Sequence, residues 1–173
     1  MQAPTDPDVP TPRLVQYPDG IWSIDTEHLR PDMAASHLVV ANGRAAFVDT
    51  GANNAVPLLL AALDAQGLGP EAVDFLLLTH VHLDHAGGAG LLMESLPNAT
   101  AVLHPRGARH MIDPSKLEAG ARAVYGDPQF EAVYDRIHPI PAERVRVVAD
   151  GEVIALGGRA FECLHTEGHA RHH

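Results

Sequence analysis

The sequence has little of what a secreted, membrane-bound or nucleic-acid-binding protein needs. It holds one cysteine, Cys163, so no disulfide can form within the chain. Its start shows no basic stretch followed by an apolar run, and no apolar run approaches the roughly 18 residues of a membrane helix. Lys and Arg number 12 against 22 Asp and Glu, which gives a formal net charge of −10. Binding nucleic acid or an anionic membrane takes clustered Lys and Arg, so we expect neither as a partner. Without a visible signal peptide or membrane helix, we expect a soluble cytoplasmic protein.

The 173 residues are enough for one domain with a hydrophobic core. We divide the chain into a flexible, proline-rich N-terminal arm over 1–12 and one domain over 13–173. Pro-Asp-Gly turns one predicted β-hairpin within 13–25, and Asn42-Gly43 turns a second within 37–51. The order of all predicted elements indicates an α/β protein with a mixed sheet backed by helices. The remaining elements are a helix capped by Asn53 or Asn54 and ending near Gln66, a strand over 73–79, a short helix over 87–97, a strand over 100–105, helical structure over 106–124 interrupted near Asp113-Pro114, and three strands within 144–169.

The segment FLLLTHVHLDHAGG, residues 75–88, runs from an apolar strand directly into ionisable side chains. These are His80, His82, Asp84 and His85. A loop that curls at the end of a buried strand can direct His80 and His82 to one point and Asp84 and His85 to a neighbouring point. Imidazole and carboxylate are natural ligands of zinc, iron and manganese, and so many ionisable groups beside a buried strand are costly without a cation. The loop therefore predicts a metal site, against the alternative of a polar loop with accidental histidines.

The pattern Thr-His-x-His-x-Asp-His-x-Gly-Gly resembles the metallo-β-lactamase superfamily. Two further motifs are similar to motifs of that family: FVDTG at 47–51, and HTEGHA at 165–170 in place of Thr-Pro-Gly-His. The resemblance extends from about Leu38 to the end of the chain. The segment over 102–117 is similar to one in a little-characterised branch of the family. The resemblance implies an αβ/βα sandwich, with mixed sheets flanked by helices.

The resemblance also implies a set of ligands. A first metal ion would be held by His80, His82 and His169, and a second by Asp84 and His85. Asp49 would lie behind the site and orient a ligand histidine, with a simple capping carboxylate after a strand as its alternative. Two zinc ions are the expected cofactor, with iron or manganese as alternatives. We assign no ligand role to the other histidines. His173 stands where the family often has a further histidine, His172 has no clear role, and His165 is near the site in sequence. His104, His110 and His138 are predicted to be surface or packing residues.

The sequence departs from the family pattern in two places. Glu167 replaces the usual proline, which loosens that turn and adds a negative charge near the cations. The chain also stops just after His169, where the family continues into a second half with a bridging aspartate and a last histidine. We therefore expect an N-terminal part of the fold that lacks most of the second half. If 173 residues were the whole protein, it would need a homodimer partner or a smaller core, and its second metal site would be weak.

These residues favour a metal-dependent hydrolase of small molecules. A metal-bound hydroxide would attack an ester, thioester, lactone or amide carbonyl, and Asp84 would position it and shuttle a proton as the catalytic carboxylate. The first alternative is an iron-dependent redox enzyme of the same fold, of the sulfur dioxygenase or di-iron oxygen-reducing type, which bound iron would reveal. The oxygen-reducing type commonly has a glutamate at the position of His82, so this histidine favours hydrolysis. A metal-stabilised binding module without catalysis is the second alternative.

Overall fold

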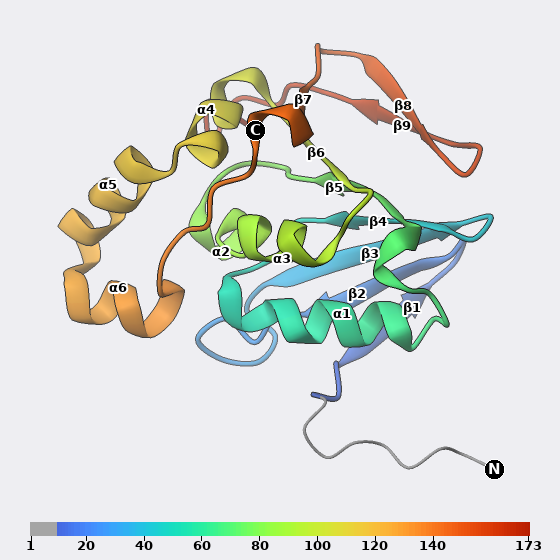
Figure 1. The fold of residues 1–173 in the computed structure, drawn as a ribbon, viewed down its shortest axis with the longest axis horizontal. Helices are drawn as coiled ribbons and strands as arrows, with labels where there is room; N and C mark the ends of the chain where they lie inside the picture. Colours follow the sequence, from blue (N-terminus) through green and yellow to red (C-terminus); the bar gives the residue numbers. More distant parts are fainter. Residues whose placement is uncertain (1–9) are drawn as a thin grey trace.

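The computed structural model describes residues 10–173. Most of the predicted arm over 1–12 lies outside these residues, so the arm and the domain boundary at 13 stay predictions. Within the described residues the main sheet has seven strands in the order β1 to β7 (Figure 1). Its strands are β1 Leu14–Tyr17, β2 Ile21–Asp25, β3 Ala35–Ala41, β4 Arg44–Val48, β5 Val73–Leu77, β6 Thr100–Leu103 and β7 Val145–Val147.

The sheet is mixed, as the sequence predicts. Pairs β1–β2, β2–β3 and β3–β4 are antiparallel, and pairs β4–β5, β5–β6 and β6–β7 are parallel. Both predicted hairpins are confirmed, with Asn42 and Gly43 at φ values of 49° and 75° between β3 and β4. Positive φ at both central positions is the geometry of the tight hairpin turn that Asn-Gly favours.

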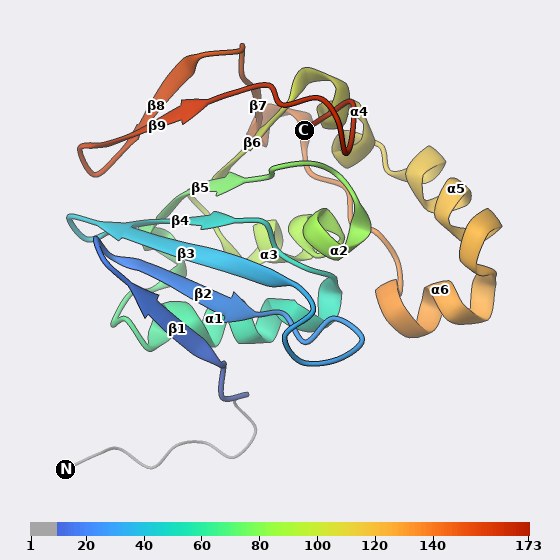
Figure 2. The same cartoon turned by 180° about the vertical axis from the view of Figure 1, so that it is seen from behind.

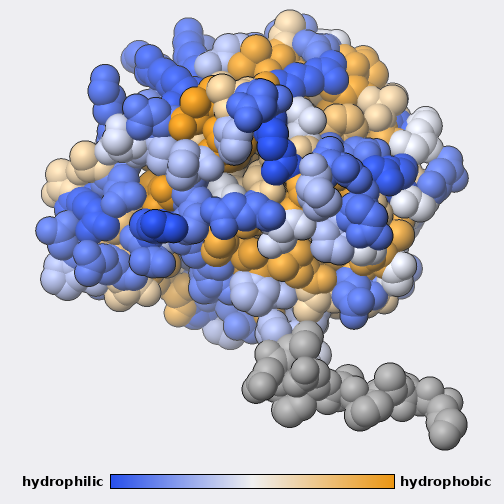
Figure 3. Space-filling view, in the orientation of Figure 1, coloured by the Kyte–Doolittle hydropathy of each residue, from blue (hydrophilic) through white to orange (hydrophobic). Residues whose placement is uncertain are grey.

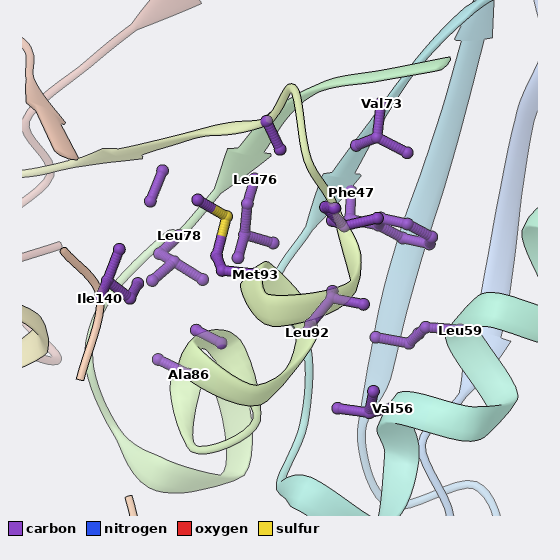
Figure 4. Close-up of a cluster of buried hydrophobic side chains, with 14 of the residues drawn as sticks. Phe47, Val56, Leu59, Val73, Leu76, Leu78, Ala86, Leu92, Met93 and Ile140 are labelled. Atoms are coloured by element: carbon purple, nitrogen blue, oxygen red, sulfur yellow. The ribbon is translucent and has the colours of Figure 1, made fainter. Parts of the chain in front are cut away.

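The core lies between one face of this sheet and the helices α1 Val56–Asp64, α2 Leu83–Ala86 and α3 Ala89–Ser95, as both ribbon views show (Figures 1 and 2). Phe47 and Leu76 come from the sheet and meet Leu59 of α1 and Leu92 of α3, each fully buried (Figure 4). Burying such a side chain contributes about 1.5–3 kcal/mol of hydrophobic free energy. The packing therefore fixes the ends of β4 and β5 relative to α2.

The predicted cap of α1 is wrong. Residues Asn53–Ala55 form a 3₁₀ turn, and α1 begins at Val56 without a side-chain cap. The Asn53 amide donates instead to the carbonyl oxygens of Tyr134 and Arg136, at 3.1 and 2.8 Å. The side chain is therefore used to attach a distant segment of the chain, which local sequence cannot reveal.

The opposite face of the sheet is partly covered by a second, two-stranded sheet within the described residues, β8 Glu152–Leu156 and β9 Arg159–Cys163. Buried Leu156 packs on Val39 and Ala46 from the main sheet. At the β8–β9 turn, Gly157 has a φ of 53°, and a Cβ there would lie 2.1 Å from the carbonyl oxygen of Ala41. Only glycine allows this close approach of the two sheets.

A helical arm extends beyond the sheet on the side of α2 (Figure 2). It consists of α4 Pro105–Ile112, α5 Ser115–Tyr125 and α6 Asp127–Tyr134. The predicted break near Asp113-Pro114 is confirmed. The sequence predicts no helix or strand between 124 and 144, yet α6 lies there and packs Phe130 and Tyr134 against Leu83.

The surface seen in Figure 3 shows apolar residues as patches between hydrophilic ones. Among the described residues, no helix has both the length and the apolar character that crossing a membrane requires.

Candidate metal centre

The predicted ligands of the first loop lie at the carboxyl ends of two neighbouring parallel strands. Asp49 follows β4, and Thr79 and His80 follow β5. His82 precedes the first residue of α2, and this short helix carries Asp84 and His85. Carboxyl ends of adjacent parallel strands meet at one edge of a sheet, so residues separated by 30 or more positions come into hydrogen-bonding distance here.

A buried carboxylate organises this edge. The side chain of Asp49 is 8% exposed and accepts hydrogen bonds from the Thr79 amide at 2.8 Å and from the Thr79 hydroxyl at 2.8 and 3.0 Å. Its Oδ2 also accepts from Nδ1 of His85 at 2.9 Å. This hydrogen bond raises the pKa of His85, although burial opposes the rise. With its proton on Nδ1, neutral His85 presents the lone pair of Nε2.

Thr79 connects the same carboxylate to His80. Its single hydroxyl proton is donated to Asp49, so the hydroxyl oxygen accepts from Nδ1 of His80, 2.9 Å away. That leaves Nε2 of His80 as a lone-pair donor, and this buried atom has no hydrogen-bond partner within residues 10–173. Burial, followed by the nearby His85 and His82, lowers the pKa of His80 to about 4, which favours the neutral ring.

His80 shares its position with two other imidazoles. One ring nitrogen each from His80, His82 and His169 lies within 4.8 Å of the others. Nδ1 of His82 and Nε2 of His169 are 3.0 Å apart. Burial, then the neighbouring His169, lowers the pKa of His82, so this ring too favours its neutral form. Three converging imidazole nitrogens, one of them buried without a partner, fit a tetrahedral or larger metal site with an open position.

The other two predicted ligands lie beside this group. Nε2 of His85 is 3.6 Å from Oδ2 of Asp84, and the rings of His85 and His80 are 4.3 Å apart between centroids. Asp84 and His85 thus form a neighbouring pair of donors. The assignment of these residues to two separate metal ions stays a prediction.

The structure places five of the remaining histidines in three environments. His172 lies at the site, where its ring stacks 6.2 Å from that of His80 and its Nδ1 accepts from the Val81 amide at 3.3 Å. His173 is also close, 5.2 Å from His80 between ring centroids, and contacts Thr166. His104 and His165 pair with each other at 4.2 Å, while His138 is buried against Glu94 at 2.7 Å.

The sequence did not lead us to a role for Thr79 or for His172, although both contact the site. Thr79 received no role, although its place directly between the strand and His80 was a usable signal. His172 has no comparable signal, because its contact depends on the course of the last residues past α4.

Glu167 forms an ion pair with Arg106. Its carboxylate accepts from the Arg106 guanidinium at 2.6 Å, and the same guanidinium nitrogen donates to the carbonyl oxygen of Arg171 at 3.2 Å. Arg106 of α4 therefore holds the segment on both sides of His169. This contact supplies a restraint at the turn where the family pattern has proline.

A cavity of about 450 Å³ opens next to the ligands. His82 and Asp84 line it, together with Tyr134 of α6 and an apolar face of α5. Burial raises the pKa of Tyr134 to about 12, so its phenol stays protonated at neutral pH. This volume suits a small molecule.

Comparison with known proteins places the chain in a family. A model described as the metallo-beta-lactamase superfamily matches residues 29–173. The chain is 30% identical over 149 residues to the metallo-beta-lactamase fold-containing protein ST1585 of Sulfurisphaera tokodaii, covering 83% of this chain and 52% of that protein. It is 36% identical over 132 residues to a hydroxyacylglutathione hydrolase of Xanthomonas axonopodis pv. citri, covering 72% and 48%.

Solved structures agree on the fold. The metallo-beta-lactamase SMB-1 bound to 2-mercaptoethanesulfonate superposes with a TM-score of 0.67 at 25% identity, over 88% of this chain and 53% of that one. The subclass B3 metallo-beta-lactamase MEM-A1, from a soil metagenome library, gives 0.66 at 26% identity, over 88% and 52%. The chain thus spans about half the length of the relatives it matches.

Proposed function

Because the chain belongs to the metallo-beta-lactamase superfamily, we propose that it supplies the metal-binding face of a metal-dependent hydrolase. The observation that carries the proposal is the unpartnered, buried Nε2 of His80, whose ring offers a nitrogen within 4.8 Å of ring nitrogens of His82 and His169. A buried polar atom without a partner costs about 1–3 kcal/mol, and a bound cation removes that cost. The substrate would be a small molecule with an ester, thioester, lactone or amide bond.

Each ligand has a proposed part. His80, His82 and His169 hold one zinc ion, and Asp84 with His85 holds a second. When bound, zinc lowers the pKa of a water molecule towards neutrality and polarises a carbonyl oxygen. Asp49 keeps the proton of His85 on Nδ1, and through Thr79 it keeps the proton of His80 on Nδ1 as well. Both Nε2 atoms are then held ready to bind.

Asp84 is the proposed catalytic carboxylate. It lines the cavity, and its side chain is 42% exposed, so a substrate can reach it. Its Oδ2 faces His85, which leaves Oδ1 to accept a proton and return it to the leaving group. Tyr134 lines the same cavity with a protonated phenol, which can donate a hydrogen bond to the substrate.

The first experiment is metal content per chain, measured by mass spectrometry on full-length protein purified without added metal. We expect close to two zinc ions per chain. His82→Ala should lose most of the bound metal and the hydrolysis of lactones and thioesters, while His37→Ala on β3 serves as the matched control. Retention of both metal and activity in His82→Ala would refute the assignment. One or two iron ions per chain would instead support the redox alternative and direct the search to oxygen uptake.

Other expectations from the sequence stay predictions. They are the cytoplasmic location, the lack of nucleic-acid partners and the homodimer. Sedimentation of the full-length protein addresses the last of these.

A further inference from the structure

One wall of the cavity beside the proposed metal ligands is formed by a single helix, α5. Its lining residues from α5 are Lys116, Leu117, Gly120, Ala121, Val124 and Tyr125. Positions spaced by three and four residues share one face of a helix, so a single stripe of α5 forms this wall. Val124 is 77% exposed and Tyr125 is 52% exposed, although both are large and apolar in body. The wall therefore offers apolar surface to whatever enters the cavity.

The same stripe begins with a cation. Lys116 is the only lysine of the chain, and it stands in the first turn of α5. Together with His110 it also lines an adjoining hollow that Arg109 and Asp113 complete. Nε of Arg109 donates to Nε2 of His110 at 3.3 Å, and Lys116 lines the same hollow. Positive charge thus gathers at the cavity of a protein whose formal net charge is −10.

These two cations differ from five of the other ten Lys and Arg residues. Arg13, Arg44, Arg122 and Arg146 form ion pairs with carboxylates, and Arg106 pairs with Glu167. Within residues 10–173, Lys116 and Arg109 form no ion pair with any carboxylate. The nearby carboxylate of Asp113 accepts from the Ser115 amide at 3.2 Å. Both cations are therefore available to an anionic ligand.

We propose that the cavity selects substrates that carry an anionic group, held by Lys116 and Arg109, on an apolar segment that lies along α5. The scissile carbonyl would then lie at His82 and Asp84, which line the same cavity. A carboxylate on an aliphatic acyl chain is the simplest such ligand, and a phosphonate shares its chemistry. The inference rests on the proposed hydrolase function and names the substrate class of that site.

The test compares matched substrates. Mono-p-nitrophenyl suberate ends in a carboxylate, and the p-nitrophenyl ester of monomethyl suberate has the same chain without the charge. On the full-length, metal-loaded protein we expect a higher kcat/KM for the charged ester, through a lower KM. Lys116→Met keeps the apolar stem, and it should lower the ratio of charged to neutral kcat/KM about two- to fivefold, as expected for the loss of one charge pair at an exposed site. Arg30→Met removes an exposed cation elsewhere and should leave the ratio unchanged.

Several results would overturn the proposal. One is a ratio that Lys116→Met leaves at the wild-type value, and another is an equal fall in Arg30→Met. A phosphonate-ended ester distinguishes the anion: faster cleavage than that of the carboxylate ester would identify a phosphoryl ligand as the preferred anion, still held by Lys116.

A binding experiment separates failure of this proposal from failure of the hydrolase assignment. Octanesulfonate coordinates metals poorly, so calorimetric titration of the protein reports mainly the cavity. Binding that Lys116→Met weakens about two- to fivefold supports the anion site even if neither ester is cleaved, in which case the hydrolase assignment alone is refuted. Equal affinity in wild type and variant would refute the anion site whatever the activity.

Discussion

The two parts of the candidate metal centre are held in different ways. His80 and His85 are tied to one buried carboxylate, directly or through Thr79, at the ends of two core strands. His169 lies in a segment without helix or strand, and the ion pair beside it joins Arg106 to Glu167, two side chains that are each 56% exposed. The first part is therefore fixed by the fold itself. The second depends on surface contacts, which are worth far less in water.

This difference suggests how the site is assembled. Hydrogen bonds at the strand ends form when the core packs, so most of the order of His80 and His85 is reached before any ion binds. The segment that carries His169 gains more of its order when it binds the ion. We expect variants of the first part to weaken metal binding more than variants of the second.

The largest effect is expected for Asp49→Asn. The amide keeps the shape of the side chain, and asparagine tolerates the φ of 58° found here. It replaces an acceptor of the Thr79 amide, the Thr79 hydroxyl and His85 Nδ1 with a group that must donate at one side. We expect zinc affinity to fall about 10- to 100-fold and unfolding free energy to fall by ~2 kcal/mol, measured by chelator competition and urea denaturation.

Asp19→Asn is the matched control, because Asp19 has a φ of 61° in an exposed turn. It should change neither quantity. Unchanged zinc affinity in Asp49→Asn would contradict the orienting part we give to this carboxylate.

A smaller effect is expected for Thr79→Val. Valine preserves the volume but removes the hydroxyl that connects Asp49 to His80. The His80 ring then loses its tautomer restraint while His85 keeps its hydrogen bond. We expect an approximately tenfold loss of affinity for the first metal ion, read by stepwise titration. Thr100→Val, at the opposite end of the parallel strands, is the control, and a loss confined to the second ion would contradict the assignment.

The smallest effect is expected for Arg106→Ala. It removes the ion pair to Glu167 and the bond to the Arg171 carbonyl, both at the surface. Exposed pairs contribute about 0.2–1 kcal/mol, so metal affinity should fall by up to about fivefold. Glu167→Gln should give part of this loss, and the double variant should show non-additivity in a double-mutant cycle. A loss larger than that of Asp49→Asn would reverse the comparison between the two parts.

The sequence predicts those features of the fold that depend only on residues close together in the chain. Asn42-Gly43 identifies its turn because few residues accept positive φ, and the loop over 79–85 identifies its donors because their spacing follows the chain's own curl. The break at Asp113-Pro114 is likewise visible, because proline interrupts a helix. These features cover most of the strands and the donors of the first part.

What the sequence does not reveal depends on contacts between distant residues. Asn53 reads as a helix cap, yet it bonds carbonyls more than 80 positions away. Helix α6 spans eight residues, and it is stabilised by packing of Phe130 and Tyr134 against a remote cluster. Glu167 reads as an added charge near the cations, but its partner Arg106 precedes it by 61 positions. Propensity and periodicity carry no information about such pairs.

The single lysine has a practical consequence for chemistry on this protein. Amine-reactive reagents modify Lys and the α-amino group, so on these 173 residues their only side-chain target is the exposed Lys116 on the wall of the cavity. A fluorophore attached there would report ligand entry by a change in emission. With an amine reagent that carries no dye, a fall in the labelling of Lys116 on addition of ligand would measure how much of the cavity is occupied.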